Sequence, residues 1–245
     1  MGWLFNKKSN RSADISLLHT DIHSHLIPGI DDGSPDMETT VELVKQMYDL
    51  GYRKLILTPH VREDSFENDP STFDSRLEDV VQAVKEVGID MDFEVGAEHT
   101  MDETFNALMK THDLKTFHGK YILVEFPFFN LPIRMKEIFF DLQVEGFKLI
   151  LAHPERYATY LAKDYETLES LKDRGIMFQM NILSLDGYYG KEVKKFAEYL
   201  VKKNYIDILG SDCHNMRHIE AMKKAFQNKE IIDLIESGRL KNNKF

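Results

Sequence analysis

The amino-acid sequence predicts an α/β fold, a closed or nearly closed barrel of seven parallel strands in which a helix follows each strand. Short apolar runs alternate with amphipathic segments about every thirty residues, which is the spacing of βαβ units. A polar residue able to bind a metal ion or a phosphate stands at or just past the end of every run. Chemistry after every strand is typical of a (β/α) barrel, whereas an open doubly wound sheet binds its ligands at one switch point.

The seven predicted strands are apolar on both faces, as parallel strands covered by helices require. The runs are 17–22, 54–57, 91–95, 121–124, 147–151, 176–180 and 206–209. The polar residues behind them, in the same order, are His23 with His25, then His60, Glu98, Glu125, His153 and Asn181, and finally Asp212 with His214. We expect these side chains to meet at the carboxyl end of the barrel.

The predicted helices carry recognisable start and stop signals. The segment 34–36 offers an N-cap, a proline and an early acid before the periodic stretch 37–50. A capping box at 71–74 precedes a second helix at 77–87. Further helices are expected at 103–110, 133–145, 164–174, 192–202 and 219–226, with a last one at 231–235.

Bulk composition indicates one domain. A chain of 245 residues that is 42% hydrophobic can bury one large core, and no linker or repeat divides it. We expect the domain to span 17–245 and residues 1–16 to form a flexible extension, although the apolar and basic start could touch a membrane surface. The net charge of -10 argues against a protein that binds nucleic acid along its backbone. One cysteine and no apolar stretch of roughly 20 residues favour a cytoplasmic protein without a transmembrane segment.

A cluster of divalent metal ions is the chemistry that these residue types indicate. Side chains alternate along an extended strand, so Asp21, His23 and His25 are expected to point the same way. Two imidazoles at that spacing can hold one ion, and Asp21 could accept the other ring N–H of a histidine. Each residue alone is weak evidence, but nine on one rim are hard to explain by packing. Imidazoles and carboxylates without a thiolate suit manganese, iron or zinc.

The pattern resembles the polymerase-and-histidinol-phosphatase (PHP) superfamily, and most of all its bacterial protein-tyrosine phosphatase branch, which is found with capsule and exopolysaccharide tyrosine kinases. The resemblance covers the chain from about Leu17 onward and runs in the family order. It is carried by the segments DIHSH (21–25), IDDG (30–33), TPH (58–60), GAE (96–98), VEF (124–126), AHPERY (152–157) and GSDCHN (210–215). It implies a distorted seven-stranded barrel of the PHP type that holds three metal ions, with manganese as the expected metal.

The resemblance also implies how the ligands are divided. The first metal would take His23, His25, Glu98 and Asp212; the second would share Glu98 and add Glu125 and His153; the third would take Asp32, His60 and His214. The implied reaction is hydrolysis of phosphotyrosine in proteins by a metal-bridging hydroxide. The implied substrate is the tail of a tyrosine kinase that regulates capsular or exopolysaccharide synthesis.

Two arginines are candidates for binding the phosphate beside His153. Arg156 lies three residues beyond His153, and its planar guanidinium can bind two phosphate oxygens at once. Arg217 is the second candidate. Cys213 is not expected to be a nucleophile, because no arginine follows it at the spacing of cysteine phosphatases and strand alternation points it away from Asp212 and into the core.

The substrate is the least constrained part of the prediction. The apolar loop 126–132 and the pair Tyr188 and Tyr189 could enclose a phenyl ring, or could simply cover the outer core. The main alternative is a PHP-family phosphatase of a small phosphomonoester such as histidinol phosphate, whose site should offer an acid to the substrate amine. A nuclease or proofreading module and a non-catalytic metal or phosphoprotein binder are the remaining alternatives.

Overall fold

The structure is a computed structural model that describes residues 11–63, 66 and 68–245. Most of the expected N-terminal extension, residues 1–10, lies outside the described residues. The rest of it packs against the domain: Ala13 and Ile15 are buried, and the Ala13 amide donates to the Phe226 carbonyl at 2.7 Å. A 3-10 helix, η1 (Ile15–Leu17), then leads into the first strand.

The described residues form nine strands, and every strand pairing is parallel. One sheet has the order β1-β2-β4 and the other the order β3-β5-β6-β7-β8-β9. The strands are β1 (Thr20–Ser24), β2 (Lys54–Leu57), β3 (His60–Val61), β4 (Asp92–Val95), β5 (Glu98–Thr100), β6 (Tyr121–Glu125), β7 (Lys148–Ala152), β8 (Met177–Asn181) and β9 (Ile206–Gly210). The predicted α/β class with parallel strands is confirmed.

A single closed barrel of seven strands is not confirmed, because the strands make two sheets. The second predicted strand ends at Leu57 as expected, but after Pro59, which has no amide to donate, the chain forms an additional strand, β3. The third ends at Val95 as expected, but after Gly96, where a β-carbon would lie only 2.6 Å from the Phe117 ring, the chain forms an additional strand, β5. Between β1 and β9 the structure has one isolated bridge, Ser24 to Cys213, rather than a continuous ladder.

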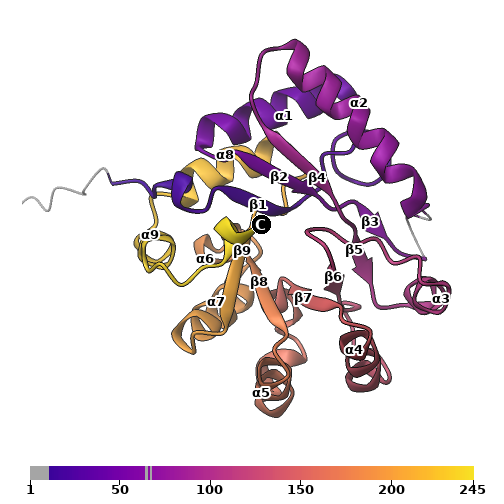
Figure 1. Cartoon of the computed structure of the whole chain (residues 1–245). Helices are drawn as coiled ribbons and strands as arrows, with labels where there is room; N and C mark the ends of the chain where they lie inside the picture. The colour runs from indigo at the N-terminus through magenta and orange to yellow at the C-terminus, as the bar shows by residue number, and fades with distance from the viewer. Residues whose placement is uncertain (1–10, 64–65, 67) are drawn as a thin grey trace, which may run out of the picture.

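The described residues also form nine α-helices, of which the last two follow β9. They are α1 (Met37–Leu50), α2 (Phe73–Glu86), α3 (Glu103–Thr111), α4 (Met135–Val144), α5 (Tyr165–Asp173), α6 (Ile182–Asp186), α7 (Lys191–Lys202), α8 (Met216–Ala225) and α9 (Lys229–Glu236). Short 3-10 helices complete the fold: η2 (Pro70–Thr72), η3 (Pro154–Tyr157), η4 (Leu161–Lys163) and η5 (Asn242–Lys244). In Figure 1 the strands gather in the middle, and α2, α3, α4, α5 and α7 lie on the outside.

Local signals explain where the helices start and stop. Asp36, rather than Ser34, caps α1 by accepting the Thr39 amide at 2.8 Å, and Gly51 ends the helix in the left-handed conformation. The short helix α6 was not predicted, since its five residues directly extend an apolar run. No helix in the described part of the chain combines the length and apolar character needed to cross a bilayer.

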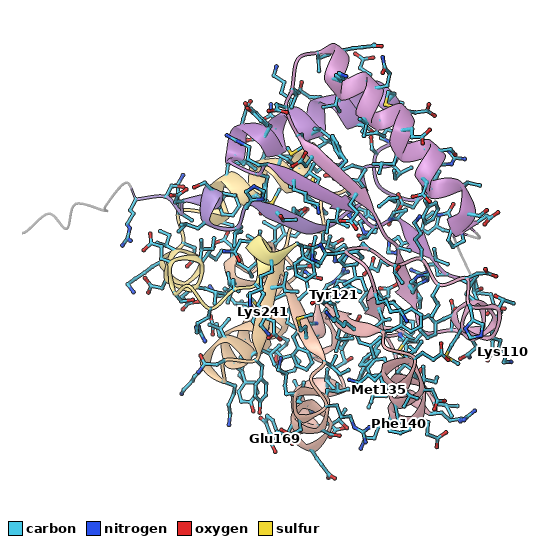
Figure 2. All side chains as sticks on the ribbon, viewed as in Figure 1. Lys110, Tyr121, Met135, Phe140, Glu169 and Lys241 are labelled. Atoms are coloured by element: carbon cyan, nitrogen blue, oxygen red, sulfur yellow. The ribbon has the colours of Figure 1, made fainter. Side chains whose placement is uncertain are left out.

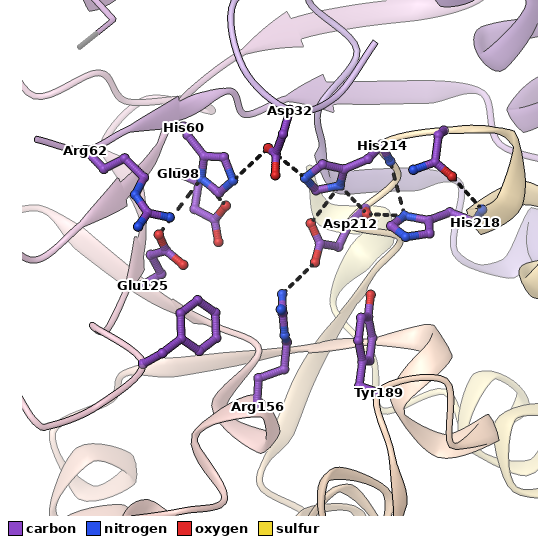
Figure 3. Close-up of a pocket in the computed structure, with 12 residues that line it drawn as sticks. Asp32, His60, Arg62, Glu98, Glu125, Arg156, Tyr189, Asp212, His214 and His218 are labelled. Carbon is purple, nitrogen blue, oxygen red and sulfur yellow. Dashed lines mark hydrogen bonds and ion pairs between the residues drawn. The ribbon is translucent and has the colours of Figure 1, made fainter. Parts of the chain in front are cut away.

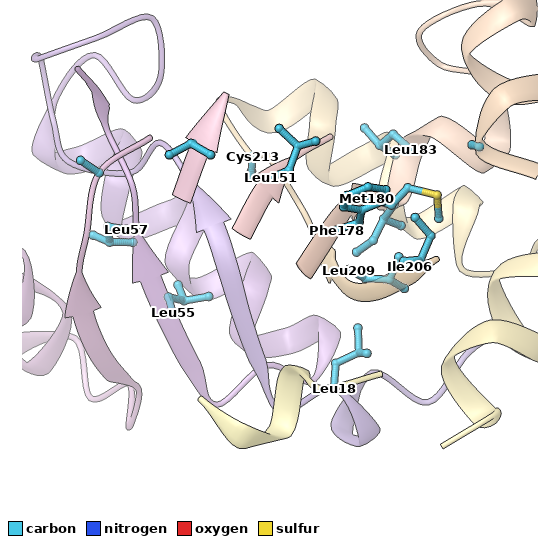
Figure 4. Packing of buried hydrophobic residues seen from close by; sticks show 14 of the residues in the cluster. Leu18, Leu55, Leu57, Leu151, Phe178, Met180, Leu183, Ile206, Leu209 and Cys213 are labelled. Atoms are coloured by element: carbon cyan, nitrogen blue, oxygen red, sulfur yellow. The ribbon is translucent and has the colours of Figure 1, made fainter. Parts of the chain in front are cut away.

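Two apolar clusters fill the molecule. The larger packs the strands against the helices, and Figure 4 shows part of it, with Cys213 and Leu183 among its residues. The smaller cluster includes Ile22, Leu123, Ile208 and Phe245. Figure 2 shows the outer helices carrying side chains such as Phe140 on α4.

The end of the chain joins the first strand to the last. The Asn242 side chain is 1% exposed, accepts the Leu209 amide at 3.0 Å, and donates to the carbonyls of Leu209 at 2.7 Å and Thr20 at 3.0 Å. These bonds link Thr20, the first residue of β1, to Leu209 in β9. Asn242 thus helps to hold the two sheets together.

Candidate metal centre

All nine predicted ligand residues come together around one pocket at the carboxyl ends of the strands. The pocket has a volume of about 310 Å³. Its lining comprises Asp32, His60, Arg62, Glu98, Glu125, Phe128, Arg156, Tyr189, Asp212, His214, Asn215 and His218. Figure 3 shows these side chains pointing toward one another from separate segments of the chain. The remaining three predicted ligands, His23, His25 and His153, are at most 1% exposed and lie against Glu98.

In the first predicted set, both histidines lie beside both carboxylates. The Nε2 atoms of His23 and His25 lie 3.3 Å from Glu98 Oε2, and 3.5 and 3.4 Å from Asp212 Oδ1. Ligands placed about 2.0–2.2 Å from one ion at tetrahedral angles lie about 3.3 Å apart. The donor atoms of His23, His25 and Asp212 all lie within 4.8 Å of one another, which fits a single divalent cation, while Glu98 lies beside both histidines.

The third predicted set has the same kind of spacing. Asp32 Oδ1 lies 3.4 Å from the Nε2 atoms of both His60 and His214. His25 joins these three residues in a group whose donor atoms all lie within 4.8 Å of one another. The side chain of Asp32 is 60% exposed, so this group stands at the open rim of the pocket.

Glu98 occupies the middle of the cluster. Its Oε1 lies 2.7 Å from His153 Nε2, and its Oε2 lies 3.1 Å from His60 Nδ1. Glu125 stands farther away, with 3.9 Å between its Oε2 and His153 Nε2. The donor atoms thus group Glu98 with His23 and His153, and separately with His60 and Glu125. The division of these residues among separate ions stays a prediction.

Buried atoms without hydrogen bonds support a cation here. Glu98 Oε2 and His60 Nδ1 are both buried, and they lie 3.1 Å apart without hydrogen-bond geometry. A buried polar atom without a partner costs about 1–3 kcal/mol, and a bound cation would remove that cost. The donor set, its spacing and these unpaired atoms fit a group of divalent metal ions.

The histidines are oriented by other residues than expected. His23 Nδ1 lies 2.8 Å from Gln179 Oε1, and His25 Nδ1 lies 2.9 Å from Asp31 Oδ2. The expected partner, Asp21, instead accepts the amide and hydroxyl of Ser211 at 2.8 and 2.6 Å. The pairing of β1 with β2 shifts register between Asp21 and Ser24, so simple alternation fails along this strand.

The electrostatics of the cluster favour positive charge. Burial opposes protonation of His23, but the carboxylates of Glu98 and Asp212 outweigh it and raise the pKa of this histidine. The pKa of His60 is likewise raised to about 10 against the effects of burial and of His25, with Glu98 as the main attraction. Burial would raise the pKa of Asp212, yet the neighbouring histidines hold it well below its ordinary value. Protons or metal ions must therefore balance these carboxylates.

The backbone brings these residues close at some cost. Asp212 and His153 adopt positive φ angles of 50° and 32°, a region that non-glycine residues seldom occupy. Glycine is needed at two close approaches, because a β-carbon at Gly33 would lie 2.1 Å from the His25 carbonyl, and one at Gly210 2.5 Å from Gln179 Nε2. These positions are determined by the site rather than by the core.

The two predicted arginines have different surroundings. Arg156 lies in the pocket, with its Nη1 3.3 Å from Asp212 Oδ2 and its guanidinium carbon 4.9 and 4.8 Å from the ring centres of Phe128 and Tyr189. Arg217 does not line this pocket; it lines a separate surface hollow between α6 and α8. A phosphate-binding role for Arg217 stays a prediction.

Asn181 and Cys213, singled out in the sequence, have different surroundings. The Asn181 amide donates to Asp212 Oδ2 at 2.7 Å, so it supports a predicted ligand directly. Cys213 is fully buried in the core, and burial raises the pKa of its thiol well above the ordinary value. A buried, neutral thiol agrees with the expectation that it is not a nucleophile.

The pocket contains functional candidates that sequence reasoning missed. Arg62 follows His60 by two positions, so strand alternation could have placed it on the same side. His218 had no expected partner, yet its Nδ1 lies 3.0 Å from the Asp212 carbonyl oxygen and accepts the His214 amide at 3.2 Å. No pattern in the sequence signals that His218 contacts the backbone of two predicted ligands, because His218 lies in the first turn of α8.

Comparisons with known proteins point in one direction. Residues 19–231 match the family model described as "Capsular polysaccharide synthesis, CpsB/CapC". The tyrosine-protein phosphatase YwqE of Bacillus subtilis (strain 168) is 30% identical over 217 residues, which are 88% of this chain and 83% of that protein. The tyrosine-protein phosphatase CpsB of Streptococcus pneumoniae is 28% identical over 204 residues, which are 80% of this chain and 83% of that protein.

Solved structures agree with the sequence comparisons. A crystal structure from work on YwqE from Bacillus subtilis and CpsB from Streptococcus pneumoniae, described as metal-dependent tyrosine phosphatases, matches with a TM-score of 0.76 and 28% identity. The match covers 91% of this chain and 94% of that one. The histidinol phosphate phosphatase HISK of Lactococcus lactis matches with a TM-score of 0.54 at 14% identity, which shows a shared fold alone.

Proposed function

The chain belongs to the CpsB/CapC family of capsular polysaccharide synthesis, and from this premise we propose that it is a metal-dependent phosphatase that hydrolyses phosphotyrosine in proteins. The main support for this proposal is that nine residues with nitrogen or oxygen donor atoms come together around one pocket. The Arg156 guanidinium lines the same pocket. The curated relatives YwqE and CpsB are named tyrosine-protein phosphatases, and the chain covers 83% of the length of each.

The residues of the pocket divide the work of phosphate hydrolysis. Bound divalent ions would supply a water-derived nucleophile at neutral pH and offset charge on the phosphate. Arg156 offers two parallel N–H donors to the non-bridging oxygens, which stabilises charge as it spreads in the transition state. Asn181 holds the outer oxygen of Asp212 at 2.7 Å and so keeps that carboxylate oriented.

Three divalent ions, with manganese as the first choice and iron or zinc as others, belong to this proposal. Mixed imidazole and carboxylate donors without a thiolate support that choice. The carboxylates of Asp32, Glu98, Glu125 and Asp212 would offset four of the six positive charges of three dications. The remaining surplus would attract a phosphate dianion even though the chain carries a net charge of -10.

The substrate proposal favours phosphotyrosine over histidinol phosphate. A site for histidinol phosphate needs an acid for the substrate amine. Among the described residues that line the pocket, every carboxylate belongs to the proposed metal-binding cluster, and the others are arginine, histidine, asparagine or aromatic. The family's link to capsular polysaccharide synthesis supports the tyrosine-rich tail of a polysaccharide-assembly kinase as the protein substrate.

Phosphate release from matched peptides tests the proposal. Purified protein loaded with manganese should hydrolyse a phosphotyrosine peptide faster than the same peptide with phosphoserine, and faster than histidinol phosphate. A chelator should abolish release, and manganese should restore it. The double variant His23→Ala/His25→Ala should be inactive under all conditions. Equal or reversed rates for the phosphotyrosine and phosphoserine peptides would reject the tyrosine assignment.

A further inference from the structure

The Arg156 guanidinium lies between two aromatic rings. Its central carbon is 4.9 Å from the ring centre of Phe128 and 4.8 Å from that of Tyr189, both within the range of a cation–π interaction. Figure 3 shows Tyr189 beside Arg156, whose guanidinium points toward Asp212. Phe128 comes from the loop after β6 and Tyr189 from the turn before α7, so the two rings approach from different segments.

Polar contacts alone do not fix the Arg156 side chain. Among the described residues, its guanidinium has one polar partner, Asp212 Oδ2, at the long distance of 3.3 Å. That oxygen also accepts the Asn181 amide at the shorter distance of 2.7 Å. Arginine has several rotatable bonds and loses much entropy when it is ordered, so a single weak contact leaves it free to move.

The two rings are themselves held by the strand ends. Phe128 stacks on His153 with ring centres 6.3 Å apart and an angle of 12°, and it also contacts Tyr157 at 5.8 Å. The Tyr189 hydroxyl accepts a 3.5 Å hydrogen bond from Asn181, the last residue of β8. Both rings therefore contact residues at the strand ends, where the proposed metal ligands also lie. They hold the guanidinium at a fixed position relative to those ligands.

On the premise of the proposed phosphatase function, we propose that Phe128 and Tyr189 are positioning residues that hold Arg156 in place for the phosphoryl group. In this arrangement the faces of both rings are in contact with the guanidinium. They are therefore not the surfaces that enclose the phenyl ring of phosphotyrosine, which is the role that aromatic loops at this site first suggest. We call the pair of rings of Phe128 and Tyr189 the clamp. The clamp acts on the phosphate end of any substrate.

Binding of inorganic phosphate tests the clamp, because phosphate has no phenyl ring. In the manganese-loaded protein, Phe128→Ala and Tyr189→Ala should each weaken phosphate binding about tenfold, within the range expected for loss of a cation–π contact. Calorimetric titration measures this dissociation constant without requiring turnover. The kcat/KM for a phosphotyrosine peptide should fall by a similar factor.

Two comparisons separate positioning from a general structural effect. Phe128→Leu keeps an apolar side chain but lacks the aromatic face, so it should behave like Phe128→Ala, whereas Phe128→Tyr should restore binding. Phe129→Ala removes the adjacent phenylalanine, which is 94% exposed and outside the pocket lining, and should change nothing. In the Arg156→Ala background, replacing either ring should have no further effect on phosphate binding.

The outcomes distinguish this inference from the proposed function. An unchanged phosphate dissociation constant in both ring variants, or an equal loss with and without Arg156, would overturn the clamp while leaving the phosphatase intact. Failure of the wild-type protein to release phosphate from any phosphotyrosine peptide would instead reject the proposed function. Thermal melting of each variant confirms that a loss of binding is not a loss of folding.

Discussion

The Nε2 atoms of His23 and His25 lie 3.2 Å apart, although both rings are completely buried. Two nitrogens with lone pairs do not attract each other at this distance without a shared proton or cation between them. Against the effect of burial, Glu98 and Asp212 raise the pKa of His23, and Asp31, with smaller contributions from Asp212 and Glu98, raises the pKa of His25. In the metal-free protein a metal ion therefore competes with protons for these two histidines.

Metal binding should release protons and strengthen as the pH rises. Because the pKa values of His23 and His25 are raised, these histidines stay protonated to higher pH. Protons therefore compete with the cation for their ring nitrogens. Titration calorimetry of manganese in buffers with different ionisation enthalpies measures the protons released. Manganese binding to the His23→Ala variant should release fewer protons than manganese binding to the wild-type protein. A metal affinity that does not vary between pH 6 and pH 8 would contradict this account.

Replacement of the two arginines should have unequal effects. Arg156→Ala removes a donor aimed at the phosphate and should lower kcat/KM for a phosphotyrosine peptide by about 100- to 1000-fold. Arg156→Lys should recover little, since an ammonium cannot supply two parallel donors. Arg217 lines a separate hollow, so Arg217→Ala should lower kcat/KM much less than Arg156→Ala does. A large loss in Arg217→Ala would show that this side chain reaches the substrate.

Glu155 should make the stability of the metal-free protein depend on pH. Burial raises its pKa from 4.5 to about 7, although Ser184 and Asn181 donate hydrogen bonds to it. Since the folded-state pKa lies above the unfolded-state value, its stabilising contribution is complete below pH 4.5 and is lost as the pH rises through 7. Glu155→Gln keeps the acceptor oxygen and cannot ionise.

The measurement is the difference in the free energy of unfolding between Glu155→Gln and wild type, taken from denaturant titrations of the metal-free proteins. This difference should move in favour of the variant by about 3 kcal/mol between pH 4.5 and pH 8. Glu169→Gln, at an exposed position on α5, controls for the loss of a negative charge. A difference that stays constant across this range would mean that Glu155 does not titrate there.

Loss of the Asn242 side chain should weaken the whole domain. Asn242→Ala leaves the buried Leu209 amide and the Thr20 carbonyl without their partners, at a cost of about 3 kcal/mol. Chemical denaturation measures the change. Asn130→Ala, in an exposed loop, is the control and should be neutral. A loss below 1 kcal/mol would show that water or backbone shifts satisfy the exposed groups.

The sequence allowed the class of fold and the membership of the site to be predicted. Apolar runs followed by His, Asp or Glu depend on local pattern, and all nine predicted ligands lie together. The predicted runs 54–57 and 91–95 end where β2 and β4 end, but the short strands β3 and β5 begin with the polar residues His60 and Glu98 and so do not form apolar runs. A count of apolar runs therefore gave seven strands where the structure has nine in two sheets.

Partners of the predicted ligands were harder to predict than the ligands. Gln179 lies within an apolar run, and nothing in its neighbourhood shows that it faces His23, 156 positions away. Asp21 looked like the partner of a histidine because alternation was assumed through the register shift of β1. The clamp on Arg156 depends on two loops whose approach is set by tertiary packing. Such long-range contacts have no local signal in the sequence.

The hydrogen bonds from Ser211 to Asp21 join residues 190 positions apart. His23 and Asp212, on either side of this contact, form their share of the cation site only when β9 has reached β1. Contacts so distant in the chain slow folding, because a long loop must close before they form. The donor groups that contain Asp212 or His214 are therefore complete only after the segment that follows β9 has reached β1, whereas the group of His60, Glu98 and Glu125 does not depend on that step.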